Sequence, residues 1–106
     1  MITHFDELVE QVRKAGGKKI AVAMADEEDA LRAVVYAREQ GLADPLLVGE
    51  QRAIARAAEE SGIRLDGIAI EPAEGEAGAV GRAVGLIREG RADVLMKGRC
   101  STAAFL

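Results

Sequence analysis

Short apolar runs alternate along this chain with longer amphipathic segments, and this alternation constrains the fold more than any other feature. The first run, residues 18–25, is almost continuous in Ile, Val, Ala and Met and has no helical period. It therefore predicts a strand that is buried on both faces, as central parallel strands are. Runs at 45–48, 67–70 and 93–96 predict three more strands, and Pro72 is expected to end the third of them.

The segments around these runs predict four helices. Each has apolar residues spaced at three and four positions, and glycines follow the segments. The first helix is expected to begin at a capping Thr3, and the second at a capping Asp26. The residues expected to face the core are Phe5, Leu8, Val9 and Val12; Ala30, Leu31, Val34, Val35 and Ala37; Ile54, Ala57 and Ala58; and Ala77, Val80, Val84 and Ile87.

A strand–helix alternation with short connections predicts an α/β fold, a three-layer α/β/α sandwich around a mostly parallel sheet. The 106 residues provide enough chain for a single domain, which we place at 1–106. The last four residues, 103–106, stop about one turn into an apolar helix. We therefore expect a truncated N-terminal part of a longer protein. Exposed Phe105 and Leu106 would favour self-association, so a homo-oligomer is expected.

Charge and composition narrow the possible partners. The net charge is −4, so the basic surface needed for nucleic acid is not expected. Cys100 is the one cysteine, which fits a reducing compartment, and acidic residues stand where an export signal would be apolar. No stretch is long and apolar enough to cross a bilayer. We expect a cytoplasmic protein that binds no nucleic acid and no membrane, and, with His4 isolated, no metal.

The segment after the fourth predicted strand is the best candidate for chemistry, because ligands of open parallel sheets bind beyond the carboxyl ends of the strands. Residues 97–102 place two cations, Lys97 and Arg99, together with Gly98 and the hydroxyls of Ser101 and Thr102, before a predicted helix. Free backbone N–H groups at such a turn can hold a phosphate. Equally, a hydroxyl of this segment could be only a helix cap, with both cations solvated.

Two further motifs are weaker. Gly75, Gly78 and Gly81 do not have the spacing of a dinucleotide-binding turn, and the last two fall inside a predicted helix. We expect them to allow close packing of that helix on the sheet. Cys100 could be a nucleophile near a helix N-terminus, or only a plain small residue.

Three blocks of sequence carry a resemblance to a known family: KIAVA at 19–23, ADPLLVG at 43–49 and GRADVLMKG at 90–98, followed by a Thr four residues after the last Gly. In these blocks, and in their order along the chain, the sequence resembles the phosphate acetyl/butyryltransferase family. The Met-Lys-Gly block is the most specific of the three.

The resemblance implies an acyltransferase with two α/β domains and an active site between them. The reaction exchanges acyl-CoA and orthophosphate for acyl phosphate and CoA, without another cofactor. Lys97, Gly98, Ser101 and Thr102 match a loop that faces the cleft, where they would contact phosphate or CoA. The family's catalytic residues would lie beyond residue 106, so they stay unknown here, and this chain alone is expected to be inactive.

Two alternatives to a phosphate acyltransferase stay open. The chain could be a non-catalytic module that binds CoA or phosphate, or one half of an NAD-dependent decarboxylating dehydrogenase. The Met-Lys-Gly block argues against the dehydrogenase. The sequence does not distinguish acetyl from butyryl transfer.

Overall fold

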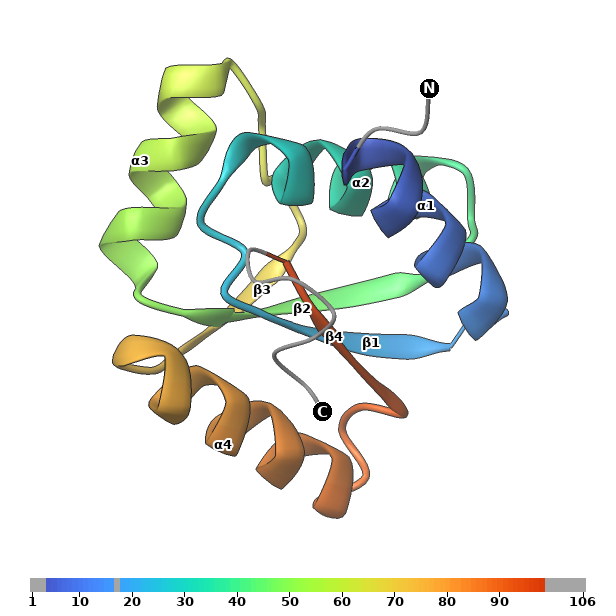
Figure 1. The fold of residues 1–106 in the computed structure, drawn as a ribbon, viewed down its shortest axis with the longest axis vertical. Coiled ribbons are helices and arrows are strands. Elements are labelled where there is room, and N and C mark those ends of the chain that lie inside the picture. Colours follow the sequence, from blue (N-terminus) through green and yellow to red (C-terminus); the bar gives the residue numbers. More distant parts are fainter. Residues whose placement is uncertain (1–3, 17, 99–106) are drawn as a thin grey trace.

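The computed structural model describes residues 4–16 and 18–98, in which helices and strands alternate as the sequence predicts (Figure 1). The elements are α1 (His4–Ala15), β1 (Lys19–Ala23), α2 (Glu28–Glu39), β2 (Asp44–Gly49), α3 (Gln51–Ser61), β3 (Ala69–Pro72), α4 (Gly75–Arg88) and β4 (Val94–Lys97). The expected helices and strands are therefore all present within this part of the chain, with boundaries shifted by up to two residues.

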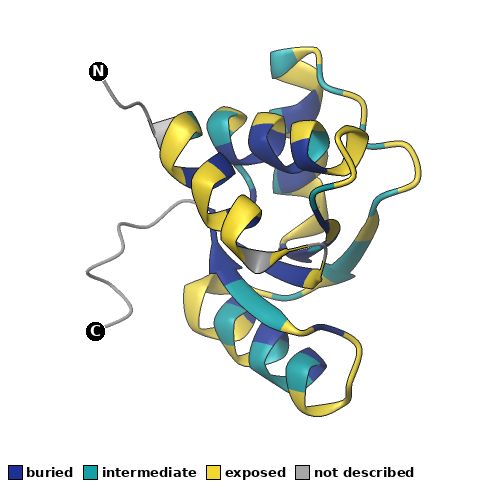
Figure 2. Ribbon diagram, turned by 90° about the vertical axis from the view of Figure 1, so that its right-hand side faces the viewer, coloured by how far each residue is buried: buried dark blue, intermediate teal, exposed yellow. Residues whose placement is uncertain are grey.

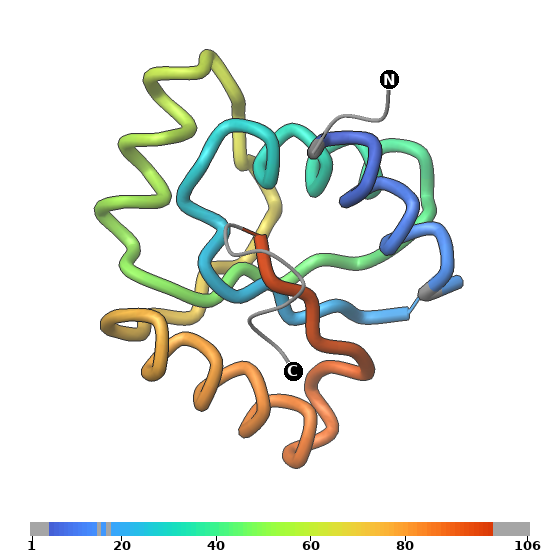
Figure 3. The backbone as a smooth tube through the Cα atoms, in the orientation of Figure 1, coloured from blue at the N-terminus to red at the C-terminus, as the bar shows by residue number. Residues whose placement is uncertain are grey.

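The four strands form one parallel sheet in the order β3-β2-β1-β4. The predicted central strand, β1, lies between β2, where Lys19 is opposite Asp44, and β4, where Ile20 is opposite Val94. Helices α1, α2 and α3 cover one face, and α4 covers the other (Figures 1 and 3). The α/β fold with a parallel sheet between two helical layers is thus confirmed.

The buried side chains divide into one cluster on each face of the sheet (Figure 2). The cluster beneath α1, α2 and α3 is built from large aliphatic residues, among them Leu8, Ile20, Leu31, Leu47 and Ile54. The cluster beneath α4 is dominated by alanine: its buried members are Ala21, Ala23, Met24, Val48, Ala79, Ala83, Leu86 and Ala92. Alternate residues of β1 serve the two clusters, which explains why its residues 20–23 are all apolar.

The inward face of α4 differs from the predicted one. We expected Ala77, Val80, Val84 and Ile87 to be buried, but Ala77 is exposed and the other three are only half-buried. The fully buried residues of α4 are Ala79, Ala83 and Leu86. Their spacing is equally helical. Small side chains let the helix axis approach the sheet closely, which outweighs the burial of the larger valines.

The glycines of α4 also differ from the prediction. Gly78 and Gly81 are exposed, and a Cβ atom added at either would meet nothing within 4 Å. The lack of a side chain at these two positions therefore does not serve close packing on the sheet. The expectation that Gly78 and Gly81 allow close helix packing is wrong.

The third strand, β3, lies two residues further along the chain than predicted. Pro72 is its last residue, whereas we expected the strand to end before it. Gly67 instead occupies a turn with a φ of 79°, in which the Ile68 N–H donates to the Leu65 carbonyl at 3.0 Å. Within the described sheet β3 has a neighbour only on the β2 side, with Pro72 opposite Gly49. A proline is tolerated on a strand whose other side has no sheet partner, since no N–H is required there.

Candidate functional site

The carboxyl ends of the strands lie along one edge of the sheet, here called the carboxyl edge. The connections that leave this edge are residues 24–27 after β1, Glu50 after β2, residues 73–74 before α4, and Gly98 after β4. Two of these connections are hydrogen-bonded to the end of β2: the Met24 N–H donates to the Val48 carbonyl at 3.1 Å, and the Ala73 N–H to the Gly49 carbonyl at 2.9 Å. The connections after β1 and β3 are therefore held against β2 at this edge.

Gly98 lies where the segment after β4 crosses the β1–α2 connection. Its N–H donates to the Ala23 carbonyl at 2.8 Å. A Cβ atom at this position would lie 2.9 Å from Ala30 Cβ and 3.0 Å from the Met24 carbonyl oxygen. The backbone approach is too close for any side chain, so the glycine of the Met-Lys-Gly block is required by packing.

Lys97 is the last residue of β4, and its side chain is buried, with 4% of its surface exposed. Strand alternation directs it to the α4 side of the sheet, where its ammonium donates to the Glu76 carboxylate in the first turn of α4. Lys97 is therefore not the solvated cation that the helix-cap alternative assumed. A buried ammonium needs a hydrogen-bonded counter-charge, and Glu76 provides one.

The connections of the carboxyl edge are otherwise acidic. Asp26, Glu27, Glu50 and Glu74 lie in them, Lys97 is the last residue of β4, and Arg52 lies in the first turn of α3, which begins at the same edge. Glu27 caps α2, since its carboxylate accepts a hydrogen bond from the Ala30 N–H at 3.2 Å. The N-cap is thus Glu27 and not the predicted Asp26. Four carboxylates at this edge disfavour the approach of an anion, whereas Lys97, Arg52 and the N-termini of α2, α3 and α4 favour it.

The predicted site residues are only partly within the described structure. Lys97 and Gly98 lie side by side at the carboxyl edge, as expected, whereas Ser101 and Thr102 fall outside the described residues. Sequence reasoning missed Glu76, which is 21 residues from its partner. The one available signal was an acid in the first turn of a helix that starts at the same edge.

A second group of charges joins α4 to β3. Arg82 contacts Glu71 at 2.7 Å and Glu89 at 2.8 Å, and Arg91 lies 3.4 Å from Glu71. The hydrogen bond from Arg82, followed by the charges of both arginines, lowers the pKa of Glu71 in spite of its partial burial. The hydrogen bond with Glu89, and then that with Glu71, raises the pKa of Arg82. Each charge has an opposite partner, so we assign this group to holding α4 on the sheet.

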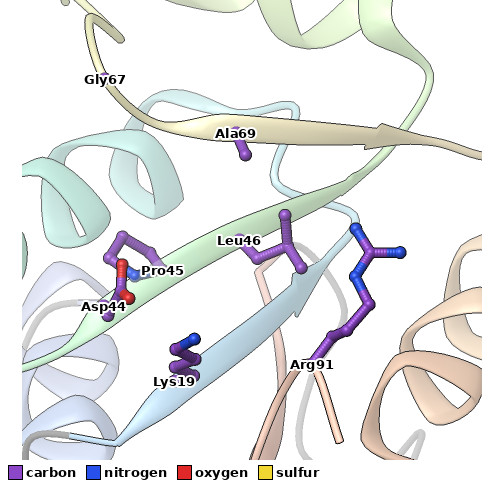
Figure 4. Close-up of a pocket in the computed structure, with 7 residues that line it drawn as sticks. All are labelled: Lys19, Asp44, Pro45, Leu46, Gly67, Ala69 and Arg91. Atoms are coloured by element: carbon purple, nitrogen blue, oxygen red, sulfur yellow. The ribbon is translucent and has the colours of Figure 1, made fainter. Parts of the chain in front are cut away.

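A small pocket of about 170 Å³ lies at the opposite, amino edge of the sheet (Figure 4). Its lining residues are Lys19, Asp44, Pro45, Leu46, Gly67, Ala69 and Arg91. These come from strand beginnings and the turns before them, whereas ligands of parallel sheets bind at strand ends. Its cation Arg91 is already directed at Glu71 and Glu89. The carboxyl edge is therefore the better candidate site.

Metal and membrane features were sought in the described ranges, 4–16 and 18–98. Within them no three His, Cys, Asp or Glu side chains are grouped so that they could hold a metal ion. No helix in these ranges has the length and apolar character that a membrane span requires.

The sequence matches a family model described as phosphate acetyl/butaryl transferase over residues 4–80. The chain belongs to this family. It is 38% identical over 106 residues to a phosphate butyryltransferase of Clostridium acetobutylicum, and 37% identical over 106 residues to one of Clostridium beijerinckii. It is 34% identical over 98 residues to a phosphate acetyltransferase of Rhizobium meliloti.

The three alignments differ in how much of each protein they cover. They include 100%, 100% and 92% of this chain, but only 35%, 35% and 31% of the respective relatives. The chain thus spans about a third of the length of the curated relatives it matches. The family model ends before Lys97, but the alignments with both Clostridium proteins include all 106 residues and so extend over Lys97 and Gly98. The resemblance of the chain to this family is therefore confirmed.

Proposed function

We propose that this chain is part of a phosphate acyltransferase that converts acyl-CoA and orthophosphate to acyl phosphate and CoA. CoA and acyl phosphate take part as substrates, and no resident cofactor is required. The family match and the names of the relatives support this reaction class. The observation that carries the site assignment is the buried ammonium of Lys97 beside Gly98 at the carboxyl edge.

Phosphoryl oxygens are suitable ligands for this group. An ammonium that is withdrawn from water binds a phosphate oxygen more strongly than a solvated one does, because fewer water molecules compete for it. Gly98 leaves the backbone beside Lys97 without a side chain. Ser101 and Thr102 follow in sequence, and we propose that their hydroxyls complete the phosphate contacts from this chain.

The proposed reaction is a direct acyl transfer. A phosphate oxygen attacks the thioester carbon, the C–S bond breaks, and the electron pair leaves with the CoA sulfur. Negative charge builds on the carbonyl oxygen during attack, and a positioned ammonium or backbone N–H can stabilise it. Both substrates are anionic, so much of the catalysis consists of holding them together. Since the described part of this edge carries four carboxylates and few cations, we propose that further cations come from outside the described residues.

The site assignment can be tested by NMR titration of the 106-residue chain with orthophosphate, then CoA, with NAD as a control. We expect orthophosphate to shift the Gly98 amide and the Lys97 side-chain signals, and Lys97→Met to weaken binding at least about tenfold. The matched control is Lys18→Met, an exposed lysine just before β1 at the amino edge. Equal affinity of Lys97→Met and the unmodified chain would refute the site.

The same titration separates the alternatives. Shifts with CoA or phosphate, but no thioester cleavage once the chain is supplied with the rest of the enzyme, would favour a non-catalytic binding module. Shifts with NAD alone would favour the dehydrogenase half.

A further inference from the structure

The contact between Lys97 and Glu76 has a consequence for ligand entry. The two side chains are very unequally exposed: 4% of the lysine side chain is accessible, against 49% of the glutamate. Glu76 therefore lies on the solvent side of the pair. A ligand that reaches the ammonium from solvent meets this carboxylate first.

Glu76 is also in a position from which it can leave. It belongs to the first turn of α4, and half of its side chain is already in water. Turning the carboxylate into solvent breaks its contact with Lys97 but buries no new charge. By contrast, Lys97 is at the end of a strand paired with β1, where Ala23 is its opposite residue, so its backbone is fixed.

We propose that Glu76 occupies the place of the ligand anion, and that orthophosphate reaches Lys97 only by displacing it. This inference rests on the proposed function, since it takes Lys97 as the phosphate-binding group. The carboxylate keeps the buried ammonium paired when no ligand is bound, and it lowers the affinity for every anion that competes for the same group.

Competition between Glu76 and phosphate determines whether removing the carboxylate raises or lowers the affinity for phosphate. If binding requires a state in which Glu76 has turned away, the apparent dissociation constant is the intrinsic one divided by the fraction of that state. Replacing the carboxylate by an amide of the same shape removes most of the competition. Glu76→Gln should therefore bind phosphate more tightly. A glutamate that only positions Lys97 for the ligand would give the opposite result.

The test compares orthophosphate and sulfate affinities of four chains: unmodified, Glu76→Gln, Glu74→Gln and Lys97→Met, each from NMR titration of the Gly98 amide. Glu74 is the matched control, because it is an exposed acid two residues before Glu76 whose side chain makes no capping hydrogen bond at the start of α4. Its substitution removes the same charge from the same edge without touching the Lys97 contact.

We expect Glu76→Gln to tighten binding by about three- to tenfold, and Glu74→Gln by less than about twofold. The gain should be similar for phosphate and sulfate, because the competition is a property of the ligand-free protein. A cooperative unfolding transition in urea will show that each variant is folded.

The outcomes separate this inference from the proposed function. Unchanged or weaker binding by Glu76→Gln, together with loss of binding in Lys97→Met, overturns the displacement and leaves the phosphate site standing. Equal binding by Lys97→Met and the unmodified chain overturns the site itself. If neither the unmodified chain nor Glu76→Gln binds phosphate or sulfate, the displacement and the phosphate site are both overturned.

Discussion

The two faces of the sheet are covered in different ways. On one face, α1, α2 and α3 bury large aliphatic side chains such as Leu31 and Leu47. On the other, α4 packs alone among the described helices, on alanines, and is joined to β3 by the Glu71–Arg82 contact. The first face derives its stability mainly from buried apolar area, and the second mainly from the close approach of small side chains, with a minor contribution from the ion pairs. The second face also carries the buried Lys97, so the less apolar layer is the one that borders the candidate site.

The largest expected difference between the faces comes from truncating a buried leucine on each. Leu31→Ala should reduce the free energy of unfolding by about 3–5 kcal/mol, and Leu86→Ala by about 2–3 kcal/mol. Both residues are 0% exposed, but Leu86 is surrounded by small side chains and a single helix that can shift into the space. Urea unfolding of the 106-residue chain measures both. Equal losses would show that the two layers are packed equally firmly.

Enlarging a small residue tests the close approach of α4. Ala83→Leu should cost about 1–3 kcal/mol, because Ala83 is fully buried between α4 and the sheet. Ala77→Leu, on the exposed side of the same helix, should change stability by less than about 0.5 kcal/mol. Thermal unfolding of both variants shows whether α4 buries the face that contains Ala83, as in the structure, or the face that contains Ala77, as the sequence predicted. A larger cost at Ala77 would favour the latter.

Replacing glycine by alanine should have a smaller effect on the free energy of unfolding, and the effect should have opposite signs at Gly78 and Gly98. Gly78→Ala should stabilise the chain by about 1 kcal/mol, because alanine is the better helix former and its Cβ meets nothing within 4 Å. Gly98→Ala should destabilise it, since the new Cβ would lie 2.9 Å from that of Ala30. Unfolding midpoints in urea provide the comparison, and stabilisation by both substitutions would contradict the described crossing at Gly98.

The smallest expected effect concerns pH. The pKa of Glu71 is lowered from 4.5, so its ion pair with Arg82 stabilises the fold above that value. This contribution is lost as the pH falls through the lowered pKa. Glu71→Gln should cost less than about 1 kcal/mol at neutral pH, and nothing once the carboxyl is protonated. Unfolding free energies across the acid range test this, with the exposed Glu59→Gln as a control that should show no such trend.

Much of the fold could be predicted because its strongest signals are local. The continuous apolar run in β1 indicated a central strand, and the spacing of Leu8, Val12 and Leu31 indicated the buried sides of α1 and α2. The face of α4 was not predicted, because residues 77, 79, 80, 83, 84, 86 and 87 are all apolar and form two overlapping stripes. Hydrophobic periodicity cannot distinguish them, and the contact with the sheet decides.

The candidate site could be predicted only in part, for a different reason. Lys97 and Gly98 belong to a recognisable block, and the order of strands and helices places them at the carboxyl edge. The partner Glu76 is defined by where α4 begins relative to β4, a tertiary relationship without a local pattern. Likewise, burial of the Lys97 side chain depends on the helix above it and is not a property of the sequence MKG.

The strand order has a consequence for how the chain reaches this structure. Strand β1 forms near the N-terminus, yet one of its two neighbours, β4, is the last described strand, so Ile20 pairs with Val94. During synthesis the β1–β2–β3 pairs can form while one side of β1 is still open. Pairing across so long a loop is slow, and an open apolar edge is prone to aggregate in the interval. The described strand that closes this edge of β1 is the one that carries Lys97, so Lys97 reaches the candidate site only in this late step.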